Sequence, residues 1–263
     1  RRLARNTQIV LADESNIARV TDPAGGAWAV EVLTDEVATA AWAVLQEVEA
    51  AGGIAAALAD GLVAGRLEAA RAEAEQGLAN RRTPLTGVSM FPLVGETPLA
   101  REPRAALPTG GLAPHRDSEV WEGLRDRATA LAGTGPAPTV VVAALGERRD
   151  FGARETFMAN LLAAGGIASV TVEGTPADVA AEARSRHTDV VVLASSPKGY
   201  SAHAADAVKG LRDNGIEVIL VAGRAKELGE TAVDGEVRDG MDVVAFLDDL
   251  LTRLGAPAEG AHS

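Results

Sequence analysis

The chain contains no cysteine among its 263 residues. Disulfide bonds, thiolate nucleophiles and cysteine-based zinc or iron–sulfur sites are therefore excluded, and a reducing, cytoplasmic location is expected. Aromatic residues are also scarce, since they make up 3% of the chain whereas hydrophobic residues as a whole make up 47%. A packed core must therefore be built mainly from alanine, valine and leucine.

Basic residues are outnumbered, with 25 lysines and arginines against 37 aspartates and glutamates and a net charge of −12. Phosphate backbones and anionic membrane surfaces attract basic faces, so we expect no nucleic-acid and no membrane partner. The most apolar stretch, residues 50–65, is too short for a membrane span and contains Asp60. The opening residues resemble the interior of a domain rather than a secretory signal, so we expect the C-terminal segment of a longer protein.

Proline and glycine, by contrast, are concentrated between residues 94 and 138. Their density disfavours regular elements and predicts a linker, interrupted by one helix at 118–131 that Ser118 caps. The sequence is therefore expected to divide into four parts: a first region at residues 1–93, the linker at 94–138, a second folded region at 139–257 and a tail at 258–263.

The first region is expected to be largely helical. Apolar residues recur at helical spacing between residues 37 and 48, which predicts a helix that Thr34 caps and Gly52-Gly53 ends. Few strands are indicated, so this region would bury its apolar faces best against a surface outside the chain. Two further helices are expected, at residues 54–62 and 66–80.

The second region alternates strands with helices. Strands are predicted at residues 139–145, 168–173, 189–195 and 217–222, with a weak fifth at 236–241. Helices are predicted at residues 153–165, 176–187, 200–214, 225–232 and 242–254. This alternation predicts an α/β fold with a flavodoxin-like doubly wound parallel sheet. Such a sheet binds ligands at the carboxyl ends of its strands, beside the switch point between the first and third.

The loops at 146–152 and 195–200 would frame that crevice. Neither contains the glycine-rich phosphate loop of a nucleotide or flavin module. Ser195-Ser196 stands where a phosphoacceptor domain needs an aspartate, and a serine nucleophile would need a positioned histidine and acid. His203 follows within the expected helix, but nothing marks it as a base. No catalytic or metal-ligating residue is identified.

Short motifs give a more specific indication. They are R-N-T-Q at residues 5–8, D-P-A-G-G at 22–26, E-V-E-A-A-G-G at 47–53 and T-G-V-S at 86–89. With these motifs the first region resembles the end of the acyl-CoA-binding (β/α)8 barrel of the methylmalonyl-CoA mutase family. The second region resembles that family's C-terminal cobalamin-binding-type domain. The resemblance implies isomerisation between methylmalonyl-CoA and succinyl-CoA through radicals made from adenosylcobalamin.

Catalytic chains of this family carry D-x-H-x-x-G after the first strand, with the histidine as the lower cobalt ligand. Aligned on Gly152, this chain has Glu147 at the aspartate position and Arg149 at the histidine position. A guanidinium group has no free electron pair for a metal, whereas neutral imidazole has one. Glu147 is therefore expected to pair with Arg148 or Arg149 instead of orienting a metal ligand.

The neighbouring loops depart from the family in the same way. Paired glycines are implied after the fourth strand, where Gly223 is followed by Arg224, and a small turn is implied after the fifth, where residues 240–244 stand. The two serines after the third strand are kept, but a proline and a lysine follow them. The resemblance thus implies a degenerate cofactor site, predicted not to ligate cobalt, at Glu147, Arg149, Gly152, Ser195, Ser196 and Gly223.

This pattern resembles the small, non-catalytic subunits of the family. It implies a supporting role in a heterodimer, in which a homologous catalytic large subunit carries adenosylcobalamin and this chain binds no cofactor. The alternative is a catalytically competent mutase that ligates cobalt in another way.

Two groups of residues leave alternatives open. Basic side chains at the crevice could dock a partner or an anion, or form a solvated edge paired with Glu147, Asp150 and Glu227, each pair contributing about 0–1 kcal/mol. Trp28 and Trp42 could line an acyl-CoA tunnel or act as core or interface anchors. The basic side chains in question are Arg148, Arg149, Lys198, Arg224 and Lys226.

Overall fold

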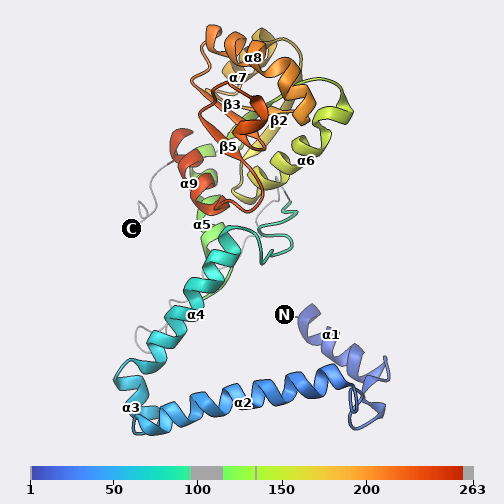
Figure 1. The fold of residues 1–263 in the computed structure, drawn as a ribbon, viewed down its shortest axis with the longest axis vertical. Helices are drawn as coiled ribbons and strands as arrows, with labels where there is room; N and C mark the ends of the chain where they lie inside the picture. The colour runs from blue at the N-terminus through green and yellow to red at the C-terminus, as the bar shows by residue number, and fades with distance from the viewer. Residues whose placement is uncertain (1, 94, 96–114, 134, 257–263) are drawn as a thin grey trace. The chain divides into compact units, whose positions relative to one another are not determined.

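The computed structural model describes residues 2–93, 95, 115–133 and 135–256. The chain divides into two compact units, Arg1–Ala69 and Ala70–Ser263, whose elements are labelled in Figure 1. Among the residues described, no helix combines the length and the apolar character needed to cross a membrane.

The first unit is helical throughout its regular elements. These are α1 (Arg2–Asp13), η1 (Ile17–Arg19), α2 (Trp28–Ala50), α3 (Ile54–Ala59) and the start of α4 (Leu62–Ala79). As predicted, α2 ends before Gly52 and Gly53, which have φ angles of 94° and 87°. Such positive angles suit glycine because it has no Cβ.

The predicted start of α2 is wrong. The helix begins at Trp28, so Thr34 lies inside it and its hydroxyl donates a hydrogen bond to the carbonyl of Val30 at 2.7 Å. Threonine can bond to a carbonyl one turn back, which allows it inside a helix as well as at a cap. The amide of Gly26 donates to the Glu31 side chain at 3.1 Å, so a carboxylate in the first turn ties the preceding turn to the helix.

The long helices of the first unit have no core of their own. None of the described side chains of α1 or α2 is buried, and Trp28 and Trp42 are 78% and 61% exposed. The interpretation of these tryptophans as core residues is therefore wrong within this chain. Their role as interface anchors stays a prediction.

The second unit contains a five-stranded parallel sheet in the order β2-β1-β3-β4-β5. This is the strand order of flavodoxin-like doubly wound folds, as predicted. The fifth strand is shorter than expected because it pairs with β4 over three residues only. The strands are β1 (Thr139–Ala144), β2 (Ala168–Glu173), β3 (Val190–Ala194), β4 (Val218–Ala222) and β5 (Gly235–Val237).

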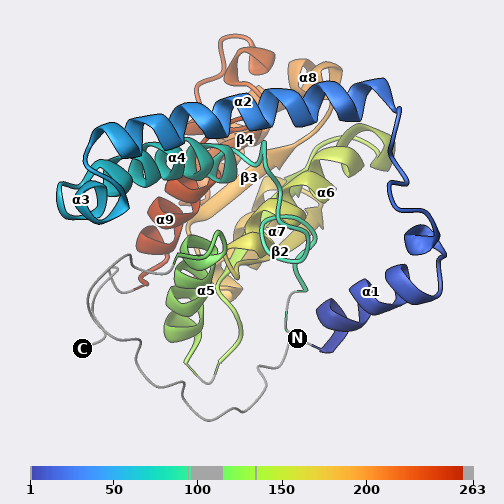
Figure 2. The ribbon, with the colours of Figure 1, turned by 90° about the horizontal axis from the view of Figure 1, so that it is seen from below.

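Helices cover both faces of this sheet (Figure 2). Alternate residues of a strand point to opposite faces, and the central strands are apolar on both. Val140 and Val142 pack in one core cluster with Trp121 of α5 (Glu119–Ala132), and this cluster includes α6 (Arg148–Ala164) and α9 (Val243–Arg253). Val141 packs in a second cluster with residues of α7 (Pro176–Ser185) and α8 (Pro197–Asp213).

Among the helices of the sheet domain, three differ most from their predicted bounds. α6 begins at Arg148 instead of 153, because the side chains of Glu147 and Asp150 form a capping box around its first turn. α8 begins at Pro197 instead of 200, because Ser196 caps it and proline suits the first helical position. The helix predicted at 225–232 is a short 3-10 turn, η2 (Ala225–Leu228), which ends at Gly229. The predicted linker helix is present as α5, although Ser118 donates to the Glu122 carboxylate rather than capping the backbone.

Candidate functional site

The two loops expected to frame a crevice do meet at the carboxyl edge of the sheet. The Ser196 hydroxyl donates to the Asp150 carboxylate at 3.2 Å, and Asp150 also accepts from the amide of Glu147 at 3.1 Å. Ser195 is fully buried, and its hydroxyl donates to the carbonyl of Leu145 at 2.7 Å. These serines therefore hold loops together, and Ser195 is not accessible as a nucleophile.

Arg149, at the position of the family's cobalt ligand, points into solvent. Its side chain is 79% exposed, and its guanidinium lies 3.2 Å from the Glu147 carboxylate, a pairing that the sequence predicted. Arg148 instead pairs with Glu155 at 2.9 Å. Gly152 lies in the first turns of α6, where a Cβ would approach only the Arg148 side chain. The residue at the position of the family's cobalt ligand is thus an exposed cation paired with a neighbouring carboxylate.

The basic rim is only partly neutralised. Arg148 and Arg149 have carboxylate partners, as a solvated edge requires. Lys198, Arg224 and Lys226 are exposed, and within the described part of the chain they form no ion pair. For these three residues, the choice between a docking surface and a solvated edge stays a prediction.

The ends of β3 and β4 are closed by three side chains, which we call the strand-end cluster: Arg154, Tyr200 and Glu227. The Arg154 guanidinium pairs with Glu227 at 2.5 Å and lies 4.9 Å from the centre of the Tyr200 ring. It also donates to the carbonyl of Ala222, the last residue of β4. The cluster therefore joins α6, α8 and η2 across the sheet edge.

Tyr200 anchors this cluster in the protein interior. It is 1% exposed, and its hydroxyl lies 2.8 Å from the carbonyl oxygen of Leu193 and 2.9 Å from that of Ala222. A phenol has one proton to donate. Since Arg154 already donates to Ala222, both carbonyls are satisfied when Tyr200 donates to Leu193.

The charges in the strand-end cluster stabilise one another. Burial raises the pKa of Tyr200, although Arg154 beside it acts in the opposite direction, so the phenol stays neutral. Partial burial also acts to raise the pKa of Glu227, but hydrogen bonds from the Arg224 amide and the Arg154 guanidinium hold that pKa below its ordinary value. Glu227 is therefore ionised and balances the arginine.

Gly223 is adapted to this arrangement. Its φ angle is +132°, and a Cβ at this position would overlap the Arg154 guanidinium. The glycine therefore makes room for an arginine of the same chain.

Sequence reasoning identified Gly223 but missed Arg154 and Tyr200, and considered Glu227 only as a partner of the rim. The available signal was that Tyr200 is the single tyrosine of the chain and lies in the first turn of the helix that follows β3.

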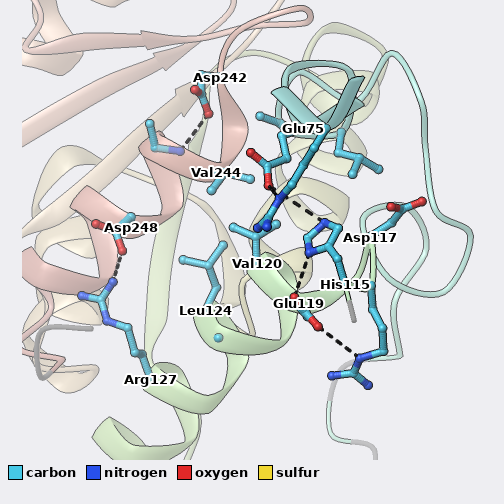
Figure 3. Close-up of a pocket in the computed structure, with 16 residues that line it drawn as sticks. Glu75, His115, Asp117, Glu119, Val120, Leu124, Arg127, Asp242, Val244 and Asp248 are labelled. Carbon is cyan, nitrogen blue, oxygen red and sulfur yellow. Dashed lines mark hydrogen bonds and ion pairs between the residues drawn. The ribbon is translucent and has the colours of Figure 1, made fainter. Parts of the chain in front are cut away.

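A cavity of about 580 Å³ lies elsewhere in the second unit, between α4, α5 and α9. Figure 3 shows His115 between Glu75 and Glu119, with its Nδ1 atom 2.9 Å from the Glu119 carboxylate. Arg127 pairs with Asp248 across the cavity wall. The charged groups that line this cavity thus largely neutralise one another. No cluster suited to a metal ion occurs among the residues described.

The second unit is, by its strand order, a flavodoxin-like α/β domain in which side chains of the chain itself close the carboxyl ends of β3 and β4. Residues 1–105 match the family model described as methylmalonyl-CoA mutase. The chain is 46% identical over 259 residues to the methylmalonyl-CoA mutase small subunit of Streptomyces virginiae. It is 43% identical over 262 residues to that of Propionibacterium freudenreichii subsp. shermanii.

These two alignments cover 97% of the chain and 41% of each small subunit. The methylmalonyl-CoA mutase large subunit of the same Propionibacterium is 44% identical over 98 residues, which are 37% of this chain and 14% of that subunit. The chain belongs to the methylmalonyl-CoA mutase family, and it spans about two fifths of the length of the small subunits that it matches.

Proposed function

We propose that the chain is part of the supporting subunit of a heterodimeric, adenosylcobalamin-dependent methylmalonyl-CoA mutase. In this proposal a homologous large subunit binds the cofactor and interconverts methylmalonyl-CoA and succinyl-CoA. Small and large subunits of that name occur in one Propionibacterium. Similarity to the small subunit extends along 97% of the chain but to the large subunit along 37%, which supports the assignment to the supporting partner.

The strand-end cluster is the observation that carries the non-catalytic role. In a flavodoxin-like fold the carboxyl edge of the sheet is where a ligand binds. Here Tyr200 bonds to the carbonyl of Leu193, next to the last residue of β3, and Arg154 bonds to that of Ala222 at the end of β4. Opening this edge would leave Glu227 and two backbone carbonyls without their partners, at a cost of about 1–3 kcal/mol for each unsatisfied group. The residues present do not suit a cobalamin.

The chemistry of the lower cobalt position supports the same conclusion. Cobalt needs a donor with a free electron pair, and Arg149 offers only protonated nitrogens. Its side chain is also directed to solvent and paired with Glu147. The site at Glu147, Arg149, Gly152, Ser195, Ser196 and Gly223 is accordingly proposed to be a degenerate cofactor site that ligates no metal.

The first region is proposed to be the helical end of the family's acyl-CoA-binding barrel, followed by the linker at 94–138 and the cobalamin-type domain at 139–257. The family model matches residues 1–105. The exposed apolar side chains of α1 and α2 support a role in packing against further protein surface, with Trp28 and Trp42 as anchors.

A titration with adenosylcobalamin tests the cofactor part of this proposal. The chain is expected to leave the absorption spectrum of the cofactor unchanged, whereas a catalytic large subunit should convert it to the base-off form. A base-off spectrum with the chain alone would instead support the competent mutase with another cobalt ligation.

The supporting role is tested separately by co-purification of the full-length protein with a homologous large subunit. Mutase activity is expected only when the large subunit is present, and the two chains should elute together. Turnover of methylmalonyl-CoA by the small chain unaided, or failure to form a complex, would overturn the proposal.

A further inference from the structure

A second cavity, of about 320 Å³, lies between α7 and α8 at the carboxyl ends of β1 and β2. We call it the α7–α8 cavity. Its floor consists of small or aliphatic side chains, because alanines occupy positions where longer residues would fill the space. They are Ala143 of β1, Val179 of α7, and Ala207 and Leu211 of α8. The cavity shares no residue with the strand-end cluster.

Two polar side chains stand at the mouth of this cavity. His203 and Asp206 lie three residues apart on α8, which places them on the same side of the helix. Both are exposed, and neither forms a hydrogen bond or an ion pair with a residue that the structure describes. Asp206 carries the single carboxylate among the described residues that line the cavity. An apolar floor thus meets an uncompensated negative charge.

We propose that the α7–α8 cavity binds a small ring compound with a cationic amine or amidine group. The ring would lie on the alanine floor, and the charged nitrogen would donate to the Asp206 carboxylate, with His203 as a second polar contact. A volume near the lower end of the usual range of about 300–1,000 Å³ limits the ligand to one or two rings. The charge of Asp206 selects a cation over an anion.

The location of the cavity supports this assignment independently of cobalamin. Doubly wound sheets bind ligands beside the carboxyl ends of their strands. One such crevice, at β3 and β4, is closed by Arg154 and Tyr200. The end of β1 remains open on the side of α7 and α8, where Gly146 and Gly174 add no side chains to the rim.

Benzamidine is a suitable probe, because it combines one aromatic ring with an amidinium group, and benzoate is its anionic counterpart of similar shape. Amide chemical shifts of the full chain would be followed by NMR during titration with each compound. We expect saturable shifts around β1, α7 and α8 with benzamidine, with a dissociation constant on the order of 1 mM for so small a molecule. Benzoate should give no saturable shifts.

Two variants and two matched controls test the residues. Asp206→Asn should weaken benzamidine binding roughly tenfold by removing a charge-assisted contact, and Ala207→Leu should abolish it by filling the cavity. Asp213→Asn and Ala202→Leu, exposed positions of the same helix outside the cavity, should bind as the unmodified chain does. Binding that neither Asp206→Asn nor Ala207→Leu changes, equal binding of benzoate, or no saturable shift at all would overturn the proposal. Asp206→Asn keeps the test decisive if Ala207→Leu does not fold.

Discussion

The guanidinium of Arg154 occupies the space into which a side chain at Gly223 would project. The two residues lie on different elements, Arg154 on α6 and Gly223 directly after β4. The resemblance to the mutase family implies paired glycines here to let a cofactor approach. In this chain the one glycine that remains, Gly223, makes room for the Arg154 side chain. The packing of the chain itself therefore explains why position 223 is a glycine.

Substitution of Gly223 should reveal this packing. We expect Gly223→Ala to lower the free energy of unfolding by about 2–4 kcal/mol, because the new methyl group overlaps Arg154 and the backbone has a positive φ angle. Gly229→Ala is the matched control, since Gly229 also has a positive φ angle but no neighbour within 4 Å of a built Cβ. Equilibrium urea unfolding measures both.

A double-mutant cycle then separates strain from overlap. Adding Arg154→Ala to Gly223→Ala should cost less than the sum of the two single changes, because the methyl group no longer meets the guanidinium. Equal destabilisation by Gly223→Ala and Gly229→Ala, with additive effects in the cycle, would contradict the packing.

Tyr200 should titrate at unusually high pH. Burial raises its pKa above the ordinary phenol value, even though Arg154 beside it favours the phenolate. Because the pKa of Tyr200 is higher in the folded than in the unfolded chain, the protonated phenol makes a contribution to stability that is fully present below about pH 10. This contribution is lost as the pH rises through the folded-state pKa. The chain has one tyrosine, so the change in ultraviolet absorbance that accompanies phenolate formation reports this group alone. Identical titration curves for the native and urea-unfolded chain would contradict the expectation.

The contribution of the α7 capping box to stability should have the opposite pH dependence, because it is lost as the pH falls. Hydrogen bonds from the hydroxyl and amide of Thr175 lower the pKa of the Asp178 carboxyl. A folded-state pKa below the unfolded value of about 3.9 gives stability that is present above that value and is lost as the pH falls through the folded-state pKa. The unmodified chain should therefore be more stable than Asp178→Asn near neutral pH, and the difference should shrink in acid.

Thermal unfolding across acidic pH measures this difference. Asp213→Asn is the control, because Asp213 lies on α8 and makes no hydrogen bond within the described part of the chain. A pH-independent difference between the unmodified chain and Asp178→Asn would show that the capping box does not act through the carboxylate.

Restoring a histidine should not restore cobalamin binding. Arg149→His places an imidazole with a free electron pair at the family's ligand position, but Arg154 and Tyr200 still close the ends of β3 and β4. We expect no base-off spectrum when this variant is titrated with adenosylcobalamin. Arg149→Lys, which supplies no neutral nitrogen at neutral pH, is the matched control. Base-off binding by Arg149→His alone would show that the missing ligand, and not the filled edge, was the barrier.

Local patterns in the sequence were sufficient for the first four strands, but not for the short fifth one. The apolar run at 190–194 is buried on both faces, so it predicts a central parallel strand without reference to any other segment. Helix starts were less reliable, because Thr34 is compatible with a cap and with a helix interior. The early start of α6 depends on the side chains of Glu147 and Asp150, which resemble a charged loop until their bonds to the backbone are seen.

The sequence by itself determined the order of strands and helices along the chain, the parallel α/β fold and the arginine at position 149, because each follows from residue type and local spacing. Only the tertiary structure decided what fills the sheet edge and where an open cavity remains. Arg154, Tyr200 and Glu227 come from separate elements and meet only after the sheet has formed. No short-range pattern encodes such a meeting, because it depends on how the helices pack against the strands.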